Sequence, residues 1–263
     1  MHVDLEPGPV GTAPCHARSK RITSIFVVGV DGTVGTVAPH LLHSEFTPGV
    51  LPARTGNDFA RSLGIRARPG AAVQVIADRH CEHYDMGETN GIAFGHAAVL
   101  VINTQFAREA QRLRRYIGSA SYPIASVAVY FKRRTFAVEI VERDRSERFD
   151  ALEVAFINSP VAGGALEIKI QVATIQDGLL HVAVVQDLDL RAILRDLPRA
   201  LRWHAMNVYG VHTSSLREAT IRTDVPMPIT LDGEECLRTS ADVRLLPGAL
   251  RVFVPRRMTA SNA

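Results

Sequence analysis

Residues 27–36 read VVGVDGTVGT, an apolar run that stops at Gly29 and gives way to Asp31-Gly32-Thr33. The residues from Ile25 to Val28 are continuously apolar, as in a buried strand of a parallel sheet. Glycines that follow such a strand let main-chain N–H groups approach a phosphate closely, because no Cβ intervenes and positive φ is allowed. A plain Asp-Gly turn between two strands is the alternative interpretation, and this stretch alone does not decide between them.

A second stretch of the same character follows further along the chain. Val50-Leu51 is a short strand, Thr55-Gly56-Asn57-Asp58 comes next, and Phe59 to Leu63 suits a helix that ends at Gly64. The helix expected after the first loop runs from Thr36 to Leu42, with Pro39 in its first turn, where proline is tolerated. A repeated order of strand, glycine loop and helix predicts an α/β region.

Beyond Gly70 apolar and polar residues alternate, which is typical of half-buried antiparallel strands. The expected strands are 73–75, 138–140, 154–156, 166–170, 182–184, 229–231, 235–237 and 250–254, and helices are expected at 106–116, 121–131 and 188–201. The predicted fold class is therefore α/β plus β: an incomplete Rossmann-like domain followed by an antiparallel β-sandwich domain.

The composition excludes several classes of protein. The net charge of +3 is too small for a dedicated nucleic-acid binder, so we expect no nucleic-acid partner. Cys15, Cys81 and Cys236 form no CxxC pair, which argues against a disulfide framework or a zinc ribbon. No apolar stretch is long enough for a membrane span, and prolines interrupt the first residues, so we expect neither a span nor a secretory signal. A cytoplasmic protein is the expectation.

Four motifs follow one another in the chain: Gly29-x-Asp31-Gly32-Thr33, the segment from Pro52 to Arg61 with Thr55-Gly56-Asn57-Asp58-Phe59, Asp177-Gly178-Leu179-Leu180, and Asp232-Gly233-Glu234. In this order they resemble the diacylglycerol kinase catalytic domain family, which includes bacterial lipid kinases and sphingosine kinases and shares its nucleotide fold with NAD kinases. The resemblance runs from Ile25 to Pro255. It implies ATP-dependent phosphorylation of a hydroxyl group of diacylglycerol or a related lipid.

The resemblance also implies roles for individual residues. Glu234 would accept the hydroxyl proton, and Asp232 would either orient the site or hold metal. The ATP phosphates would lie between two walls, and the structural Mg²⁺ would be held by oxygen atoms of a third loop. The first wall consists of Gly29, Asp31, Gly32 and Thr33, the second of Thr55, Gly56 and Asn57, and the Mg²⁺ ligands would be Thr174, Asp177 and the carbonyl of Leu179.

The expected partners and domain organisation combine the resemblance with the composition of the first 22 residues and the short region before Ile25. The partners would be a lipid substrate, the inner face of a membrane through peripheral contact, and a second copy of the chain. We expect a disordered lead-in at 1–22, a partial nucleotide-binding domain at 23–70 that also includes the segment near 250–258, and a lipid or substrate domain at 71–249.

Three departures from the family pattern leave two functions open. Val30 replaces a glycine of the first loop, Arg54 replaces a glycine of the second, and the region before Ile25 is shorter than in relatives, so that the chain looks N-terminally shortened. The first function is an active lipid kinase, and the alternative is a catalytically silent relative that retains lipid or nucleotide binding. Separately, the segment from His80 to His83 is either a transition-metal site or a solvated loop.

Overall fold

The computed structural model describes residues 23–29, 31–52, 57–66, 68–101, 135–159, 161–162, 168–169, 174, 176–186 and 211–256. The chain divides into two compact units. The first unit comprises Met1–Ala97, Asn158–Leu179 and Arg244–Ala263, and the second comprises Ala98–Ile157 and Leu180–Val243. The boundaries expected from the sequence, at 22, 70 and 249, stay a prediction.

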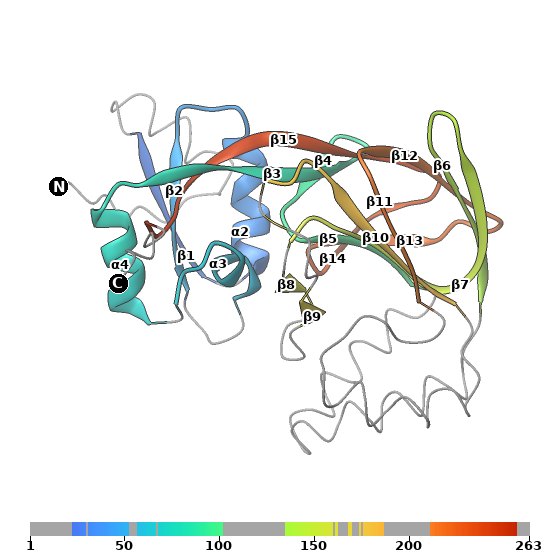
Figure 1. Cartoon of the computed structure of the whole chain (residues 1–263), viewed down its shortest axis with the longest axis horizontal. Coiled ribbons are helices and arrows are strands. Elements are labelled where there is room, and N and C mark those ends of the chain that lie inside the picture. Colours follow the sequence, from blue (N-terminus) through green and yellow to red (C-terminus); the bar gives the residue numbers. More distant parts are fainter. Residues whose placement is uncertain are drawn as a thin grey trace, which may run out of the picture. The chain divides into compact units, whose positions relative to one another are not determined.

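The first unit begins with two parallel strands and the helices that accompany them (Figure 1). In the pairing of these strands, Phe26 lies opposite Gly49 and Gly29 lies opposite Pro52. The elements are β1 (Ser24–Gly29), α2 (Asp31–Val37), the 3₁₀ helix η2 (Ala38–Leu41), β2 (Thr47–Pro52), α3 (Asp58–Ser62) and α4 (Pro69–Ala77). The predicted strand at Ile25 and the predicted helix at Phe59 are confirmed.

The helix after the first loop corrects the sequence-based prediction. It begins at Asp31 instead of Thr36, and Pro39 belongs to the 3₁₀ helix that follows it. Its sequence, DGTVGTV, is rich in glycine and β-branched residues, which are poor helix formers. The helix nevertheless forms in the folded chain, where Val34 is buried in the same core cluster as Val27 of β1. Tertiary burial thus outweighs local propensity here.

A second correction concerns Val73 and Val75, which alternate like strand residues but lie in α4. Pro69 occupies the first turn of this helix, a position where proline is tolerated. Ala72 and Val75 are buried three residues apart, whereas Val73 is exposed. This spacing is that of a helix face.

The rest of the first unit is made of antiparallel strands. β3 (Cys81–Thr89) and β4 (Ile92–Phe94) form a hairpin whose turn residues, Asn90 and Gly91, both have positive φ. Such a pair is typical of a tight two-residue hairpin turn. The long strand β15 (Ala241–Phe253) starts in the second unit and ends in the first, and β8 (Val161–Ala162) pairs with β9 (Ile168–Lys169).

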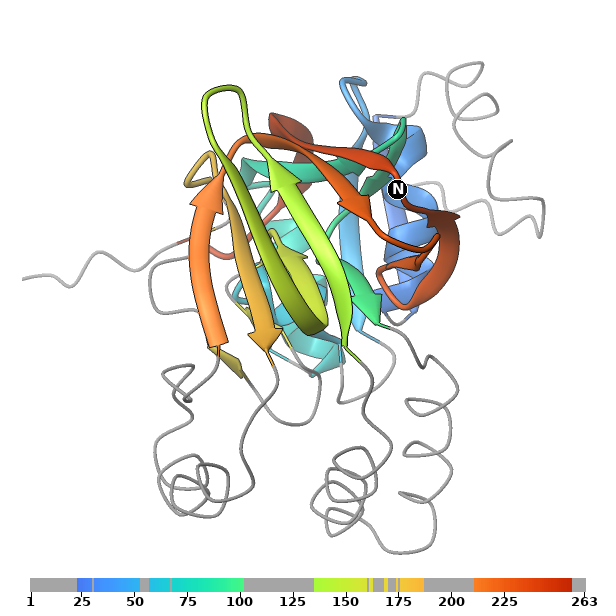
Figure 2. The ribbon, with the colours of Figure 1, turned by 90° about the vertical axis from the view of Figure 1, so that its right-hand side faces the viewer.

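The second unit is an antiparallel sheet. Its strands are β5 (Ala97–Val101), β6 (Phe136–Val141), β7 (Ser146–Ile157), β10 (Leu180–Gln186), β11 (Val211–Leu216), β12 (Glu218–Thr223), β13 (Pro228–Leu231) and β14 (Glu234–Arg238). The spatial order is β14-β13-β5-β7-β6-β12, with β10 between β7 and β11. Figure 2 shows the yellow-green hairpin of β6 and β7 beside the gold β10 and the orange β11.

The strands of this sheet supply the apolar core of the second unit. In β6 alternate residues are buried, namely Phe136, Val138 and Ile140, which is the period-2 pattern seen in the sequence. In β7 and β10 the residues 154–157 and 180–184 are buried without interruption, as in strands that are covered on both faces. The predicted class, α/β plus β, is confirmed, while the helices expected at 106–116, 121–131 and 188–201 lie outside the described residues. None of the helices among the described residues is long and apolar enough to span a membrane.

Candidate functional site

The first candidate loop is a tight junction between β1 and α2. β1 ends at Gly29 and α2 begins at Asp31, so a single residue, Val30, connects them and lies outside the described residues. A Cβ atom added at Gly29 would collide with the side chain of Thr33. Only glycine therefore fits at the end of β1 while Thr33 keeps its place in the helix. The main chain of Asp31 and Gly32 forms the first turn of α2.

The second candidate loop is attached to the first through Asn57. This residue is 2% exposed and precedes α3, whose start it caps: Ala60 N–H donates to Asn57 Oδ1 over 2.8 Å. Its amide Nδ2 donates to the carbonyl oxygen of Gly29 over 2.9 Å. Both ends of the side chain are thus engaged within the protein. The structure brings together Gly29, Thr33 and Asn57, whereas Arg54, Thr55 and Gly56 lie outside the described residues.

The third candidate loop, 174–179, is closed by Asp177. Thr174 N–H donates to Asp177 Oδ2 over 2.9 Å, and Leu179 N–H donates to Oδ1 over 3.0 Å. The hydroxyl of Thr174 accepts from Gln176 N–H over 3.3 Å. The side chain of Asp177 therefore shapes the loop. A carboxylate, a hydroxyl and the carbonyl of Leu179 are all oxygen donors, so their chemistry fits Mg²⁺.

Asp85 of β3 holds this loop in place, and the sequence reasoning missed it. The side chain is 5% exposed; its Oδ2 accepts from Gly178 N–H over 2.9 Å, and its Oδ1 accepts from Gly248 N–H over 2.7 Å. A buried carboxylate of this kind is stabilised by the main-chain donors around it. The available signal was a single acidic residue between Tyr84 and Met86, two side chains that are completely buried.

Asn158 adds a further connection within the first unit. Its Nδ2 donates to the carbonyl oxygens of Asp85 and Gly95, over 2.7 and 3.0 Å. The next residue, Ser159, is hydrogen-bonded through its hydroxyl to Ser62 of α3. The segment 158–159 therefore links the strand that carries Asp85 to the helix that Asn57 caps.

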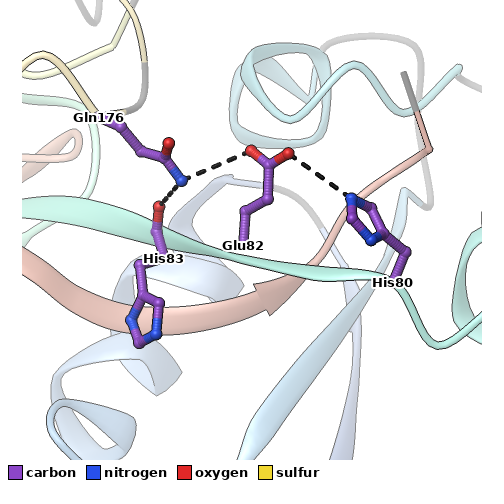
Figure 3. Close-up of polar contacts among 4 residues, drawn as sticks. All are labelled: His80, Glu82, His83 and Gln176. Atoms are coloured by element: carbon purple, nitrogen blue, oxygen red, sulfur yellow. Dashed lines mark hydrogen bonds and ion pairs between the residues drawn. The ribbon is translucent and has the colours of Figure 1, made fainter. Parts of the chain in front are cut away.

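Gln176 attaches the same loop to β3 from the solvent side. Figure 3 shows its Nε2 donating to the carbonyl oxygen of His83 over 2.6 Å and pointing toward Glu82 Oε2 at 3.5 Å. The other carboxylate oxygen of Glu82 faces His80 Nε2 at 3.6 Å. The ring of His83 lies on the opposite side of the strand from Glu82, as strand geometry requires. Within the described ranges, no group of three or more His, Cys, Asp or Glu side chains that could hold a metal ion is found.

The fourth motif is the turn of the hairpin between β13 and β14. Leu231 pairs with Glu234, and the two residues between them, Asp232 and Gly233, have φ of 48° and 95°. Two positive φ values are the mark of a type I′ turn. The turn interpretation is thus confirmed for this motif, and it leaves Glu234 exposed at the start of the edge strand β14.

Cys236 reports the electrostatic environment of this hairpin. Its thiol lies on β14, where Sγ donates to the carbonyl oxygen of Glu234 over 3.3 Å. The pKa of the Cys236 thiol is raised, first by desolvation and then by the negative charges of Glu234 and Asp232. A hydrogen bond with the main chain of Leu231 lowers the same pKa and offsets part of this rise. The two carboxylates expected to be catalytic therefore create a negative potential at this end of the second unit. The loops around Gly29 and Asp177 belong to the first unit.

Comparison with known families matches both parts of the chain. Residues 97–254 match the YegS C-terminal NAD kinase beta sandwich-like domain, and residues 8–89 match the diacylglycerol kinase catalytic domain. The first match covers more than half of the chain, and it accounts for the antiparallel second half. Asp232 and Glu234 lie within it, as do Thr174, Asp177 and Leu179.

Individual relatives carry related names. The chain is 29% identical over 248 residues to a diacylglycerol kinase of Mycobacterium tuberculosis (strain ATCC 25618 / H37Rv). The matched region covers 91% of this chain and 79% of that protein. It is 25% identical over 261 residues to a YegS-like lipid kinase of Alcanivorax borkumensis, covering 97% and 86% of the two chains. The crystal structure of a diacylglycerol kinase from Bacillus anthracis str. Sterne is similar in fold, with a TM-score of 0.74, 22% identity and coverage of 96% and 85%.

Proposed function

Because this chain belongs to the diacylglycerol kinase family of lipid kinases, we propose that it transfers a phosphoryl group from ATP to a hydroxyl group of diacylglycerol or a related lipid. The observation that supports this proposal most is the junction of Gly29, Thr33 and Asn57. There, a strand end without a side chain is fixed by a buried amide, which gives a phosphate access to main-chain N–H groups in a defined position.

The chemistry assigns different tasks to the candidate residues. The main chain from Gly29 to Thr33 and the loop from Thr55 to Asn57 would bind the phosphates of ATP. Glu234 would accept the proton of the attacking lipid hydroxyl at a carboxylate oxygen, and Asp232 would orient the acceptor. The exposed position of Glu234 on β14 leaves its carboxylate accessible to a substrate. Asn57 would act as a positioning residue, since both of its amide ends are already engaged.

A divalent ion fits the loop of Asp177. Thr174, Asp177 and the carbonyl of Leu179 would hold Mg²⁺, which when bound would neutralise charge and stiffen this loop. Added Mg²⁺ should then raise the melting temperature of the wild-type protein and have a smaller effect on Asp177→Asn. If Mg²⁺ stabilises both proteins equally, this assignment is wrong.

The enzymatic assay uses the full chain with Mg²⁺, labelled ATP and diacylglycerol in mixed micelles. We expect labelled phospholipid from the wild type and a loss of roughly 10²–10⁴-fold in rate for Glu234→Gln, since that is the usual contribution of general base catalysis. The neighbouring Glu235→Gln is the matched control, because Glu235 is also an exposed residue of β14, and it should retain activity.

The same experiment decides between the two functions left open by Val30 and Arg54. If the wild type transfers no phosphate to diacylglycerol, sphingoid bases or related lipids, the kinase proposal fails. If ATP still raises the melting temperature in that case, the chain is a silent relative that binds nucleotide. We place the active protein in the cytoplasm, where ATP is available, with its lipid substrate at the inner face of the membrane.

A further inference from the structure

An apolar surface on the first unit is left open by the elements around it. Val28 of β1 and Val73 of α4 are 63% and 56% exposed, and Phe26 is exposed as well. These residues lie far apart in the sequence but belong to elements that are packed together: β1 pairs with β2, and α4 packs on β2. Figure 1 shows α4 beside the two strands.

Phe26 and Ile76 connect the strand part of this surface with its helix part. Phe26 lies opposite Gly49, and a Cβ atom on that glycine would be 2.7 Å from Ile76 Cγ1 and 3.0 Å from Phe26 Cδ1. The side chains of Phe26 and Ile76 therefore meet above Gly49. Val28 follows on the same face of β1, and Val73 lies one turn before Ile76 on α4. We call these four residues, Phe26, Val28, Val73 and Ile76, the β1–α4 face.

Basic residues flank α4 in the chain. Arg66 and Arg68 precede α4 and Arg79 follows it, and all three are exposed. The acidic residue nearest to them in sequence, Asp78, accepts a hydrogen bond from Gln74 Nε2 over 2.7 Å. The α4 segment from 66 to 79 thus carries three arginines and a single acidic residue.

We propose that the β1–α4 face docks on the surface of an anionic membrane. Exposed apolar side chains, together with exposed arginines at both ends of α4, match the boundary between acyl chains and negatively charged headgroups. A second copy of the chain matches less well, because a symmetric contact through this face would bring the arginines of both copies close to each other. The inference rests on the proposed function, since a lipid kinase has to reach an acceptor that stays in the bilayer.

Vesicle sedimentation without ATP tests this surface. The wild-type protein should bind vesicles of phosphatidylglycerol and phosphatidylcholine, bind pure phosphatidylcholine vesicles weakly, and lose affinity as salt increases. The double substitution Val28→Ser and Val73→Ser should lower the affinity by on the order of tenfold or more, because it removes apolar area that enters the membrane. Arg66→Gln, Arg68→Gln and Arg79→Gln together should remove the preference for anionic vesicles.

The matched control is Val225→Ser. Val225 is 52% exposed, close to the value for Val73, but it lies in the second unit, so its substitution should leave vesicle binding unchanged. Val73→Ser alone, on the outer side of a helix, is the second variant in case the double substitution fails to fold. Melting temperatures verify that each variant is folded.

Three results would overturn the proposal: equal binding to both kinds of vesicle, unchanged binding after the serine substitutions, or dimers in size-exclusion chromatography that the same substitutions dissociate. The last result would assign the face to a second copy of the chain. Phosphorylation of water-soluble dioctanoylglycerol, measured in parallel, depends only on the kinase site. Loss of membrane docking and failure of the proposed kinase function are therefore distinguishable.

Discussion

Two turns of this protein share the dipeptide Asp-Gly and differ in how they are held. At Asp177-Gly178 the aspartate side chain accepts N–H groups from both sides of its own loop, and Gly178 N–H donates to Asp85. At Asp232-Gly233 the turn is fixed by the strands on either side, since Leu231 pairs with Glu234. The glycine has positive φ in both turns.

This difference shows that the aspartate of the same dipeptide can either form hydrogen bonds within its own loop or leave the loop to be held by strand pairing. In the first turn the carboxylate is part of the scaffold, so its loss should affect stability. In the second turn the strand pairing maintains the backbone, and the side chain of Glu234 is exposed to solvent. The following predictions test this contrast, beginning with the largest effect.

Asp85→Ala should have the largest effect on stability. It removes the acceptor for two main-chain donors, Gly178 N–H and Gly248 N–H, inside the first unit. Hydrogen bonds to a charged group contribute about 1.5–3 kcal/mol each, so the loss of two should lower the free energy of unfolding by about 3–6 kcal/mol. Urea denaturation measures this change. A loss below about 1 kcal/mol would mean that Asp85 does not anchor the loop.

The substitution of aspartate by asparagine distinguishes the two turns directly. Asp177→Asn replaces one accepting oxygen by an NH₂ group that faces a main-chain donor. This substitution should lower the free energy of unfolding by about 1–2 kcal/mol. Asp232→Asn should change the free energy of unfolding by no more than about 0.5 kcal/mol, because asparagine tolerates the positive φ of this position. Equal losses at both positions in urea denaturation would contradict the contrast.

Gly178→Ala and Gly233→Ala should behave alike. Open space surrounds both positions, since a Cβ atom would meet nothing within 4 Å, but φ is 71° and 95°. Alanine is strained at such angles, and each substitution should destabilise the protein by about 1 kcal/mol. Thermal unfolding of the two variants measures this cost. If the variants differ strongly, something besides backbone strain acts at one of the turns.

The smallest effect concerns the thiol of Cys236. Because the negative charge of Glu234 contributes to its raised pKa, alkylation of Cys236 should begin at a higher pH than for an ordinary thiol. Glu234→Gln should shift this onset toward lower pH, since the thiolate then forms more easily. Peptide mass spectrometry separates Cys236 from the other two cysteines. An unchanged onset would mean that Glu234 does not act on this thiol.

The sequence revealed the elements whose signal is local. The strand before Gly29, the helix at Phe59 and the hairpin turn at Asp232 each depend on neighbouring residues, and their positions were predictable. The helix at Asp31 was displaced in the prediction, because glycine and β-branched residues conceal a helix that core packing stabilises. Asp85 remained unnoticed because its partners, Gly178 and Gly248, come from distant parts of the chain.

The amide of Asn57 also has a consequence for ligand binding. By holding the carbonyl of Gly29, it removes conformational freedom from the first loop when the chain folds, before any ligand arrives. A ligand that fits this shape then binds without having to order the loop, whereas one that needs another shape has to break a buried hydrogen bond. If the loop binds the phosphates of ATP as proposed, preorganisation of this kind would make Asn57 a determinant of which ligands the loop accepts.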